Sequence, residues 1–247
     1  MRRRVVCAGA ALALVVLAGV AHAASGTQAV PPALADLPLI VQPLADAGED
    51  APDTADVYAL LMSGDGGWAK LPRDLTAGLL AAGIPVVGFN SRRYFHVRRT
   101  PEQTSQDVAR ALEHYAQAWA RPRVLLIGYS RGADVLPFVI NRLGAASHAR
   151  IALAALLNPA TETRFVIDPG ADARQDLPLQ PEVAALDGSK ILCAYGVGDR
   201  HALCPTLPTD RYDVLAIGRG HHFGGEHDAL VEAILARVRR ADVGPAH

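Results

Sequence analysis

The sequence lacks an excess of charge of either sign. Its 24 Lys and Arg face 25 Asp and Glu, a formal net charge of −1, whereas nucleic-acid-binding domains usually carry a basic surface. The 22 Gly and 17 Pro show no period, which excludes fibrous repeats. Half of the 247 residues are hydrophobic, which is enough for a sizeable core. The composition therefore predicts a globular protein of one main domain, with no nucleic acid among its partners.

An apolar run long enough to predict a membrane span is also missing. The first 23 residues instead have the three parts of a secretory signal peptide: Arg2 to Arg4, a small apolar stretch from Val5 to Val20, and the cleavage signal Ala21-His22-Ala23. An uncleaved N-terminal anchor is the alternative. Cleavage would remove three of the 24 basic side chains and leave 21 against 25 acidic ones, a net charge of −4. We therefore expect export to the periplasm.

Cysteine is scarce. Cys7 belongs to the predicted signal peptide, so that Cys193 and Cys204 remain after cleavage. An even pair of cysteines in an exported protein predicts a disulfide, and two buried free thiols are the alternative. A metal site is less expected, because the pair lacks further Cys or His residues at ligand spacing. We predict neither a metal nor a cofactor.

Short apolar strands alternate with helices from residue 56 to residue 241. This alternation is typical of an α/β domain whose mostly parallel sheet is buried between helices on both faces. Residues 24–55 predict a loose lead-in with one short strand, 37–41. The stretch 158–189 is irregular and too short for a large lid domain, but long loops of this kind are often functional. The predicted strands are 57–62, 85–89, 124–127, 151–157, 190–195 and 212–217, and the predicted helices are 72–82, 100–119, 131–143 (kinked at Pro137) and 226–240.

The motif Gly128-Tyr129-Ser130-Arg131-Gly132 lies directly after a predicted strand and directly before a predicted helix. In that context G-x-S-x-G predicts a nucleophile elbow, the tight turn that lifts a serine above the sheet edge in the α/β-hydrolase fold. The N-terminus of the following helix favours developing negative charge. We therefore predict Ser130 as the nucleophile. An ordinary strand-to-helix turn with a serine N-cap is the alternative.

A serine hydroxyl needs a base to take its proton, and in this fold an acid and then a histidine follow the serine along the chain. Asp199 and His221 occur in that order, each in a loop after a predicted strand. We predict His221 as the base, because it directly follows a Gly-x-Gly turn, and leave His222 open. Asp199 is the predicted acid that orients the imidazole. Asp213 is the rival acid, but it begins a strand and so belongs to the opposite edge of the sheet.

An esterase also needs two backbone N–H donors for the oxyanion that forms on the carbonyl oxygen. One is expected to be the N–H of Arg131, directly after the nucleophile. The other is expected from the glycine-rich segment 63–68, where the N–H of Asp65 is favoured and that of Gly66 comes next. A plain glycine turn is the alternative. Trp68, at the end of this segment, is either a core residue or part of a pocket wall.

The segment 90–99 concentrates charged and aromatic side chains after a predicted strand, and so near the same edge of the sheet. Arg92, Arg93 and Tyr94 are predicted substrate-binding residues in this segment. Together with its two other arginines they would offer four guanidinium groups to an anionic head group such as a phosphate. A solvated surface run is the alternative.

These motifs together make the chain resemble the VirJ/AcvB family of bacterial virulence-associated proteins, over roughly residues 56–238. The sequence departs from the family pattern at His96, where tryptophan is usual, and at Gly224-Gly225, where acidic residues are expected. The resemblance is carried by Ser-Gly-Asp-Gly-Gly-Trp at 63–68, Arg-Tyr-Phe at 93–95, Thr-Pro-Glu at 100–102, Gly-Tyr-Ser-Arg-Gly at 128–132, Asn-Pro at 158–159, Cys-Ala-Tyr-Gly at 193–196, Cys-Pro at 204–205 and Gly-His-His-Phe at 220–223.

The resemblance implies an exported α/β-hydrolase. Members of the family are linked to hydrolysis of lysyl-phosphatidylglycerol, an aminoacylated membrane lipid, and to type IV secretion. The first hypothesis is therefore a periplasmic serine esterase of aminoacyl-phospholipids at a membrane surface, in which Asp65 or Asp134 meets the lysyl ammonium. The second is a binding protein of a secretion-system or envelope complex on a hydrolase scaffold. The complete set of serine, acid and histidine favours the enzyme, because a scaffold has no need of all three.

Overall fold

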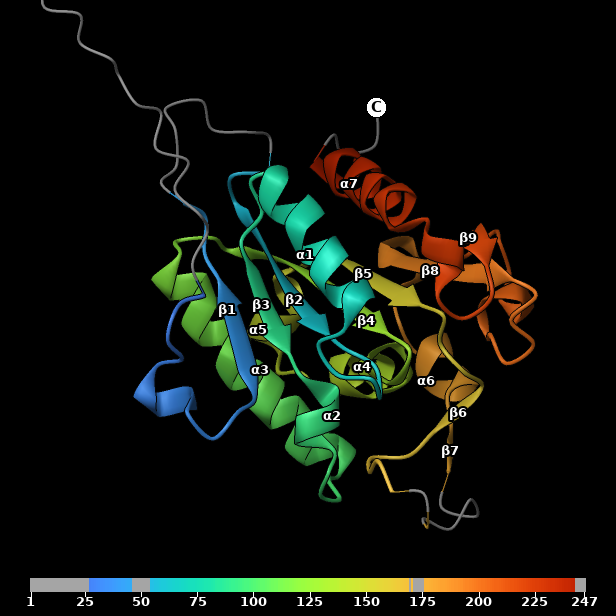
Figure 1. Cartoon of the computed structure of the whole chain (residues 1–247), viewed down its shortest axis with the longest axis horizontal. Helices are drawn as coiled ribbons and strands as arrows, with labels where there is room; N and C mark the ends of the chain where they lie inside the picture. The colour runs from blue at the N-terminus through green and yellow to red at the C-terminus, as the bar shows by residue number, and fades with distance from the viewer. Residues whose placement is uncertain (1–26, 46–53, 169, 171–175, 243–247) are drawn as a thin grey trace, which may run out of the picture.

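Seven strands form one sheet through the middle of the molecule, with helices packed on both faces (Figure 1). The computed structural model describes residues 27–45, 54–168, 170 and 176–242, so the predicted signal peptide and Cys7 lie outside the described residues. The strand order is β1-β3-β2-β4-β5-β8-β9, and only β1 is antiparallel to its neighbour. The strands are β1 (Leu39–Gln42), β2 (Val57–Met62), β3 (Val86–Phe89), β4 (Arg123–Tyr129), β5 (Ile151–Leu157), β8 (Ile191–Val197) and β9 (Asp213–Arg219).

Alternate residues along each central strand face opposite helix layers. In β2, Val57, Ala59 and Leu61 belong to the core that α1 (Lys70–Ala81) and α7 (His227–Asp242) cover. The residues between them belong to the core that α3 (Pro101–Ala118) and α4 (Arg131–Asn141) cover. Because both faces are covered, β2 is apolar and buried along its whole length. The helices are α1 (Lys70–Ala81), α2 (Ser91–Tyr94), α3 (Pro101–Ala118), α4 (Arg131–Asn141), α5 (Ala145–Ala149), α6 (Gln180–Ala184) and α7 (His227–Asp242).

The ends of the helices follow local sequence signals. Thr100 and Gln103 form a capping box at the start of α3, and Pro101 occupies its first turn. α1 ends just before Gly83, whose φ of +76° is the left-handed conformation that glycine adopts easily. α4 continues through Pro137 as one helix and ends at Asn141, two residues before the predicted end.

The segment predicted as a loose lead-in is partly built into the sheet. β1 pairs antiparallel with β3, and Leu34, Leu37 and Val41 are buried in the core on the α3 side. The Ala, Pro and Asp content of this segment conceals these few apolar contacts, which depend on partners far away in the chain. Residues 46–53 lie outside the described part.

Parallel strands bring their carboxyl-terminal loops to one edge of the sheet, where folds of this kind bind ligands. Ser63 follows β2, Ser130 follows β4 and Asn158 follows β5, while the loops after β8 and β9 carry Asp199 and His221. The irregular stretch 158–189 includes α6 and a small antiparallel pair of strands, β6 (Glu162–Thr163) and β7 (Leu177–Pro178). None of the helices in the described ranges has the length and apolar character needed to span a membrane.

Candidate active site

Ser130 forms the turn between β4 and α4, with φ +52° and ψ −121°. A positive φ is uncommon for a residue with a Cβ and is typical of a nucleophile elbow. Close packing explains the two flanking glycines of the motif. A Cβ at Gly128 would lie 2.5 Å from the carbonyl oxygen of Gly132, and a Cβ at Gly132 would lie 2.1 Å from that of Met62. The predicted elbow geometry is therefore present.

Ser130, His221 and Asp199 form one chain of hydrogen bonds. His221 Nε2 lies 2.8 Å from Ser130 Oγ, and His221 Nδ1 lies 2.7 Å from Asp199 Oδ2. When Nδ1–H donates to the carboxylate, Nε2 carries the lone pair that can accept the serine proton. This is the arrangement that general-base activation of a serine requires.

The environment of Asp199 keeps its carboxyl group ionised. Only 8% of its side chain is exposed. Burial by itself raises the pKa of Asp199, but hydrogen bonds from His221 and from the backbone N–H of His201 outweigh burial and hold that pKa below its ordinary value. An ionised Asp199 can therefore orient the imidazole and stabilise the imidazolium that forms during proton transfer.

The two rival residues have other partners. His222 Nδ1 lies 2.5 Å from the hydroxyl of Tyr129. Asp213 pairs with Arg237 and Arg240 at the start of β9, away from the carboxyl edge of the sheet. The structure thus brings His221, and not its neighbour in sequence, to the serine.

The glycine-rich segment 63–68 lies against the nucleophile. A Cβ at Gly64 would be 2.9 Å from Ser130 Cβ, so the two backbones approach as closely as a glycine allows. Asp65 and Gly66 line the cavity that contains Ser130. Arg131 opens α4, and the N–H of a first helical residue has no acceptor within the helix. Both predicted oxyanion donors therefore lie beside the serine.

The side chains of Asp65 and Arg131 form a forked ion pair. Arg131 Nε and Nη2 lie 2.9 Å and 3.1 Å from the two carboxylate oxygens of Asp65. Arg131 Nη1 also donates to Thr163 Oγ1 and to the carbonyl of Arg164, each at 3.1 Å. A bidentate pair constrains both partners in angle as well as distance. It therefore fastens the glycine-rich turn to the N-terminus of α4, where the two donors must stay aligned.

Two cavities share Asp65 in their walls. The first, of about 360 Å³, contains Ser130 and His221 and is lined largely by apolar and glycine residues. The second, of about 440 Å³, lies on the side of β6 and β7 and is rich in carboxylates. Five acidic side chains outnumber two arginines in its wall, so it carries a negative charge. The charged residues of the second cavity are Asp65, Asp134, Glu162, Asp168, Asp176, Arg131 and Arg164.

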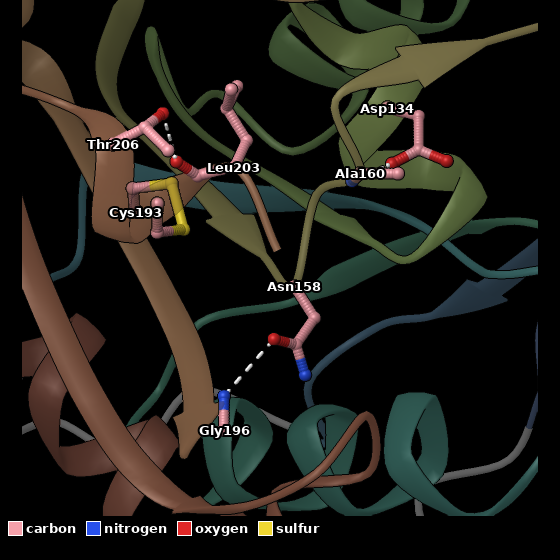
Figure 2. The surroundings of a disulfide bond; sticks show 8 residues. Asp134, Asn158, Ala160, Cys193, Gly196, Leu203 and Thr206 are labelled. Atoms are coloured by element: carbon pink, nitrogen blue, oxygen red, sulfur yellow. Dashed lines mark hydrogen bonds between the residues drawn. A yellow bond between two sulfur atoms is a disulfide. The ribbon is translucent and has the colours of Figure 1, made fainter. Parts of the chain in front are cut away.

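Asp134 is the most deeply buried of these carboxylates, with 7% of the residue exposed. One of its oxygens accepts a 2.7 Å hydrogen bond from the backbone N–H of Ala160 (Figure 2). Burial raises the pKa of Asp134 to about 7, although the N–H of Ala160 and the charge of Arg131 act in the opposite direction. A bound cation would favour the ionised form of this group.

Trp68 and Tyr94, two predicted substrate-binding residues, pack against the core. The Trp68 ring packs on β3, where a Cβ at Gly88 would lie 2.3 Å from it, and Trp68 lines neither of these two cavities. Tyr94 is 2% exposed, and its hydroxyl donates to Asp107 Oδ2 at 2.7 Å. Tyr94 is buried and Trp68 is partly buried, because both rings pack on residues of β3.

Arg92 and Arg93 lie at the protein surface. The side chain of Arg92 runs beside Gly67, next to the glycine-rich turn. Neither guanidinium group has an ion-pair partner within the residues that the structure describes. Arg99 differs from them, since its guanidinium lies 4.7 Å from the centre of the Tyr94 ring. Arg92 and Arg93 are thus available to an external anion.

The predicted disulfide joins Cys193 on β8 to Cys204, and the Cα atoms are 5.4 Å apart (Figure 2). The closed loop contains Asp199. Both cysteines are buried. The bridge therefore anchors the segment after the acid to the strand before it. In the described ranges, no group of three or more His, Cys, Asp or Glu residues could hold a metal ion.

Asn158 and the hydroxyl of Tyr129 carry no predicted role, yet both contact the histidine loop. Asn158 Nδ2 donates to the carbonyl of His221 at 2.8 Å, and Tyr129 OH lies 3.4 Å from the same carbonyl. Both residues belong to motifs of the family resemblance. Their partners lie more than 60 residues away, so that the sequence alone could not identify them.

Comparison with solved structures shows the fold. An α/β serine hydrolase without a lid from Xanthomonas campestris has 17% sequence identity and a TM-score of 0.52, over 85% of this chain and 91% of that chain. Est1E from Butyrivibrio proteoclasticus has 12% identity and a TM-score of 0.57, over 83% of this chain and 94% of that chain. The predicted α/β-hydrolase fold is thus confirmed. No curated protein matches the chain by sequence.

The sequence of this chain also matches the model of a protein family. The model of the bacterial virulence protein VirJ matches residues 56–242, which is most of the chain and includes Ser130, Asp199 and His221. The match begins where the alternating strands and helices begin, and it ends with α7. The resemblance inferred from the motifs is confirmed, and the chain belongs to the VirJ family of bacterial virulence proteins.

Proposed function

We propose that this protein is a periplasmic serine esterase that hydrolyses aminoacyl-phospholipids such as lysyl-phosphatidylglycerol. The hydrogen-bonded chain of Ser130, His221 and Asp199 carries the proposal. Nucleophile, base and acid stand in the chain order of α/β-hydrolases, and two backbone N–H groups lie beside the serine. The fold and the membership of the VirJ family support the same reading.

The reaction has two steps. Ser130 Oγ attacks the carbonyl carbon of the aminoacyl ester while His221 Nε2 takes the hydroxyl proton, and the N–H groups of Asp65 and Arg131 stabilise the oxyanion. The tetrahedral intermediate collapses, His221 protonates the departing lipid oxygen so that the lipid leaves with a free hydroxyl, and an aminoacyl-enzyme remains. Water then attacks the acyl-enzyme with His221 as base, His221 returns the proton to Ser130 Oγ, and the free amino acid leaves. No cofactor takes part in either step.

The acid-rich cavity supports a cationic aminoacyl group rather than a neutral acyl chain. It adjoins the oxyanion residues Asp65 and Arg131, and it includes the buried carboxyl group of Asp134. A lysyl group attached to Ser130 carries two amino groups, and carboxylates in a partly desolvated site interact strongly with such cations. We assign the lysyl ammonium to this cavity, beside Asp134.

The surface arginines support a phospholipid substrate, and the disulfide supports a periplasmic location. Arg92 lies beside the glycine-rich turn, Arg93 follows it on α2, and both are free to bind the phosphate of the lipid at a membrane surface. The Cys193–Cys204 disulfide is typical of an oxidising compartment such as the periplasm. The predicted signal peptide would direct the chain there.

A fluorophosphonate probe and lysyl-phosphatidylglycerol vesicles together test the proposal. We expect purified protein to be labelled on Ser130 and to release free lysine from the vesicles, and Ser130→Ala to do neither. In cells, deletion of the gene should raise the lysyl-lipid content, and only the wild-type gene should restore it. A protein that takes no label and leaves the lipid intact would contradict the esterase and favour a binding role in a secretion-system or envelope complex.

A further inference from the structure

Asn158, the first residue after β5, lies between the loops that carry the acid and the base. It is 1% exposed. Its Oδ1 accepts a 3.1 Å hydrogen bond from the backbone N–H of Gly196 (Figure 2), and its Nδ2 donates to the carbonyls of His221 at 2.8 Å and Gly220 at 3.3 Å. One side chain therefore connects the carboxyl end of β8 with the loop after β9.

Each end of the Asn158 amide is linked to the proposed triad, either through the backbone of a triad residue or through a residue hydrogen-bonded to one. The carbonyl of Gly196 accepts the backbone N–H of Asp199 at 3.1 Å, so Gly196 forms the base of the turn that places the acid. At the other end, the amide holds the backbone of His221 itself. Only a side chain with both an acceptor and a donor can bond to the N–H of Gly196 and to the carbonyl of His221. Among residues of this length, that side chain is asparagine.

The backbone around Asn158 is also held in place. Asn158 has φ +50°, a left-handed conformation that asparagine tolerates better than most residues. The next two residues contact other parts of the site: the carbonyl of Pro159 accepts the N–H of Leu203 at 2.8 Å, and the N–H of Ala160 donates to Asp134 on α4. Leu203 directly precedes the disulfide cysteine Cys204 (Figure 2).

From this placement we infer that Asn158 is a positioning residue that sets the distance between Asp199 and His221, an inference that rests on the proposed esterase function. The amide does not touch the reacting atoms. It fixes the backbones on which the acid and the base are carried, and so it keeps the imidazole aligned with Ser130. A misplacement of about 1 Å at a catalytic group costs on the order of 10²-fold in rate.

Steady-state hydrolysis of p-nitrophenyl acetate tests the inference. Asn158→Ala should lower kcat by about 10²-fold and leave KM nearly unchanged, because binding does not require the aligned imidazole. Asn158→Gly removes the same amide but relieves the left-handed backbone, so it should be equally slow. Tyr58→Phe is the matched control. It removes the buried hydrogen bond from Tyr58 OH to Leu112 O (2.8 Å) at the other end of β2, and it should lose stability but keep kcat.

A second readout is independent of turnover. The Nδ1–H proton of His221, held by Asp199, should give a downfield NMR signal in the wild type and in Tyr58→Phe, and this signal should broaden or vanish in both Asn158 variants. Wild-type kcat or an unchanged signal in Asn158→Gly would overturn the positioning role. If the wild type shows the signal but no labelling of Ser130, the esterase proposal fails, and the Asn158 variants still test the geometry.

Discussion

At the residue scale, His221 is held by contacts on three sides. Its ring nitrogens contact Ser130 and Asp199, and its carbonyl accepts the amide of Asn158. His222, one residue later, points its Nδ1 to Tyr129 instead. Two adjacent histidines therefore have different environments, and substitutions should separate their roles.

Substitution of Ser130 or His221 by alanine should remove ester hydrolysis. Loss of a triad member costs on the order of 10⁴-fold or more in kcat, and Asp199→Asn should cost as much or less. Hydrolysis assays together with circular dichroism would check that the variants stay folded. His222→Ala is the comparison: an inactive His222→Ala beside an active His221→Ala would show that the base is wrongly assigned.

The buried carboxyl group of Asp134 should make stability depend on pH. Its pKa is about 7 in the folded protein but near 3.8 in the unfolded chain. Between these values the unfolded chain has lost the proton and the folded chain has kept it, so stability falls as pH rises through this window. Asp134→Asn cannot titrate, and it should be more stable than the wild type above pH 7, by at most about 4 kcal/mol.

Urea unfolding at pH 5 and pH 8 would measure this difference. Asn keeps an oxygen for the N–H of Ala160, so the substitution changes little besides the charge. Asp210→Asn, at an exposed carboxylate, is the control and should keep the wild-type dependence on pH. The prediction would be refuted if the free energies of unfolding of the wild type and Asp134→Asn differed by the same amount at both pH values.

At the scale of elements, the proposed active site is assembled from loops that are fastened to each other. The ion pair of Asp65 and Arg131 joins the turn after β2 to α4, and the disulfide joins β8 to the segment beyond Asp199. The sheet itself holds only the ends of these loops. The cross-links therefore decide how well donors, acid and base stay aligned.

The close approach of the glycine-rich turn to the serine gives one test. In Gly64→Ala the new Cβ would lie 2.9 Å from Ser130 Cβ, so that either the turn or the serine must shift. We expect kcat to fall by about 10²-fold with little loss of stability. Gly144→Ala is the control, because a Cβ there meets nothing within 4 Å. Equal activity of the two variants would contradict the proposed oxyanion geometry.

The disulfide between Cys193 and Cys204 gives a second test at this scale. Closing a loop of this length contributes about 3 kcal/mol by the chain-entropy estimate. We expect a variant with both Cys193 and Cys204 changed to alanine to stay folded but to lose more than about tenfold in kcat, because the loop of Asp199 is freed. Mass spectrometry of the periplasmic protein under non-reducing conditions should find the bridge. Two alkylatable thiols in folded, active protein would refute this account.

At the scale of the whole molecule, opposite charges lie on two sides of the glycine-rich turn. The acid-rich cavity lies on the side of β6 and β7, and Arg92 and Arg93 belong to α2. An aminoacyl-phospholipid has the matching pattern, with a cationic aminoacyl group and an anionic phosphate. The two charged regions therefore match two parts of the proposed substrate.

Binding to anionic vesicles should depend on these arginines. Each basic side chain near an anionic membrane contributes about 1 kcal/mol, so changing both Arg92 and Arg93 to Gln should weaken binding to phosphatidylglycerol vesicles by about 30-fold at low salt. Arg239→Gln, an exposed position on α7, is the control. Sedimentation with vesicles of varied phosphatidylglycerol content would measure binding. If Arg239→Gln lost as much vesicle binding, the loss would reflect only the change in net charge.

The sequence by itself determined the features that depend on neighbours along the chain. The elbow at Ser130 follows in part from Gly128, because a Cβ there would meet the backbone of Gly132 in the same turn. The order of strands and helices follows from apolar periodicity. The pair Cys193 and Cys204 could be predicted because removal of the predicted signal peptide would leave one even pair.

Only the tertiary structure decided which distant residues meet. Trp68 packs against the core because Gly88, twenty positions later, leaves room for its ring. The ring of Tyr94 packs on Phe89, and its hydroxyl reaches Asp107 on α3. The roles of His221 and His222 depend on the direction in which one turn points each ring, and that of Asn158 on two loops that the sheet brings together. Such contacts form between backbones that are adjacent only after folding, so no pattern of nearby residues encodes them.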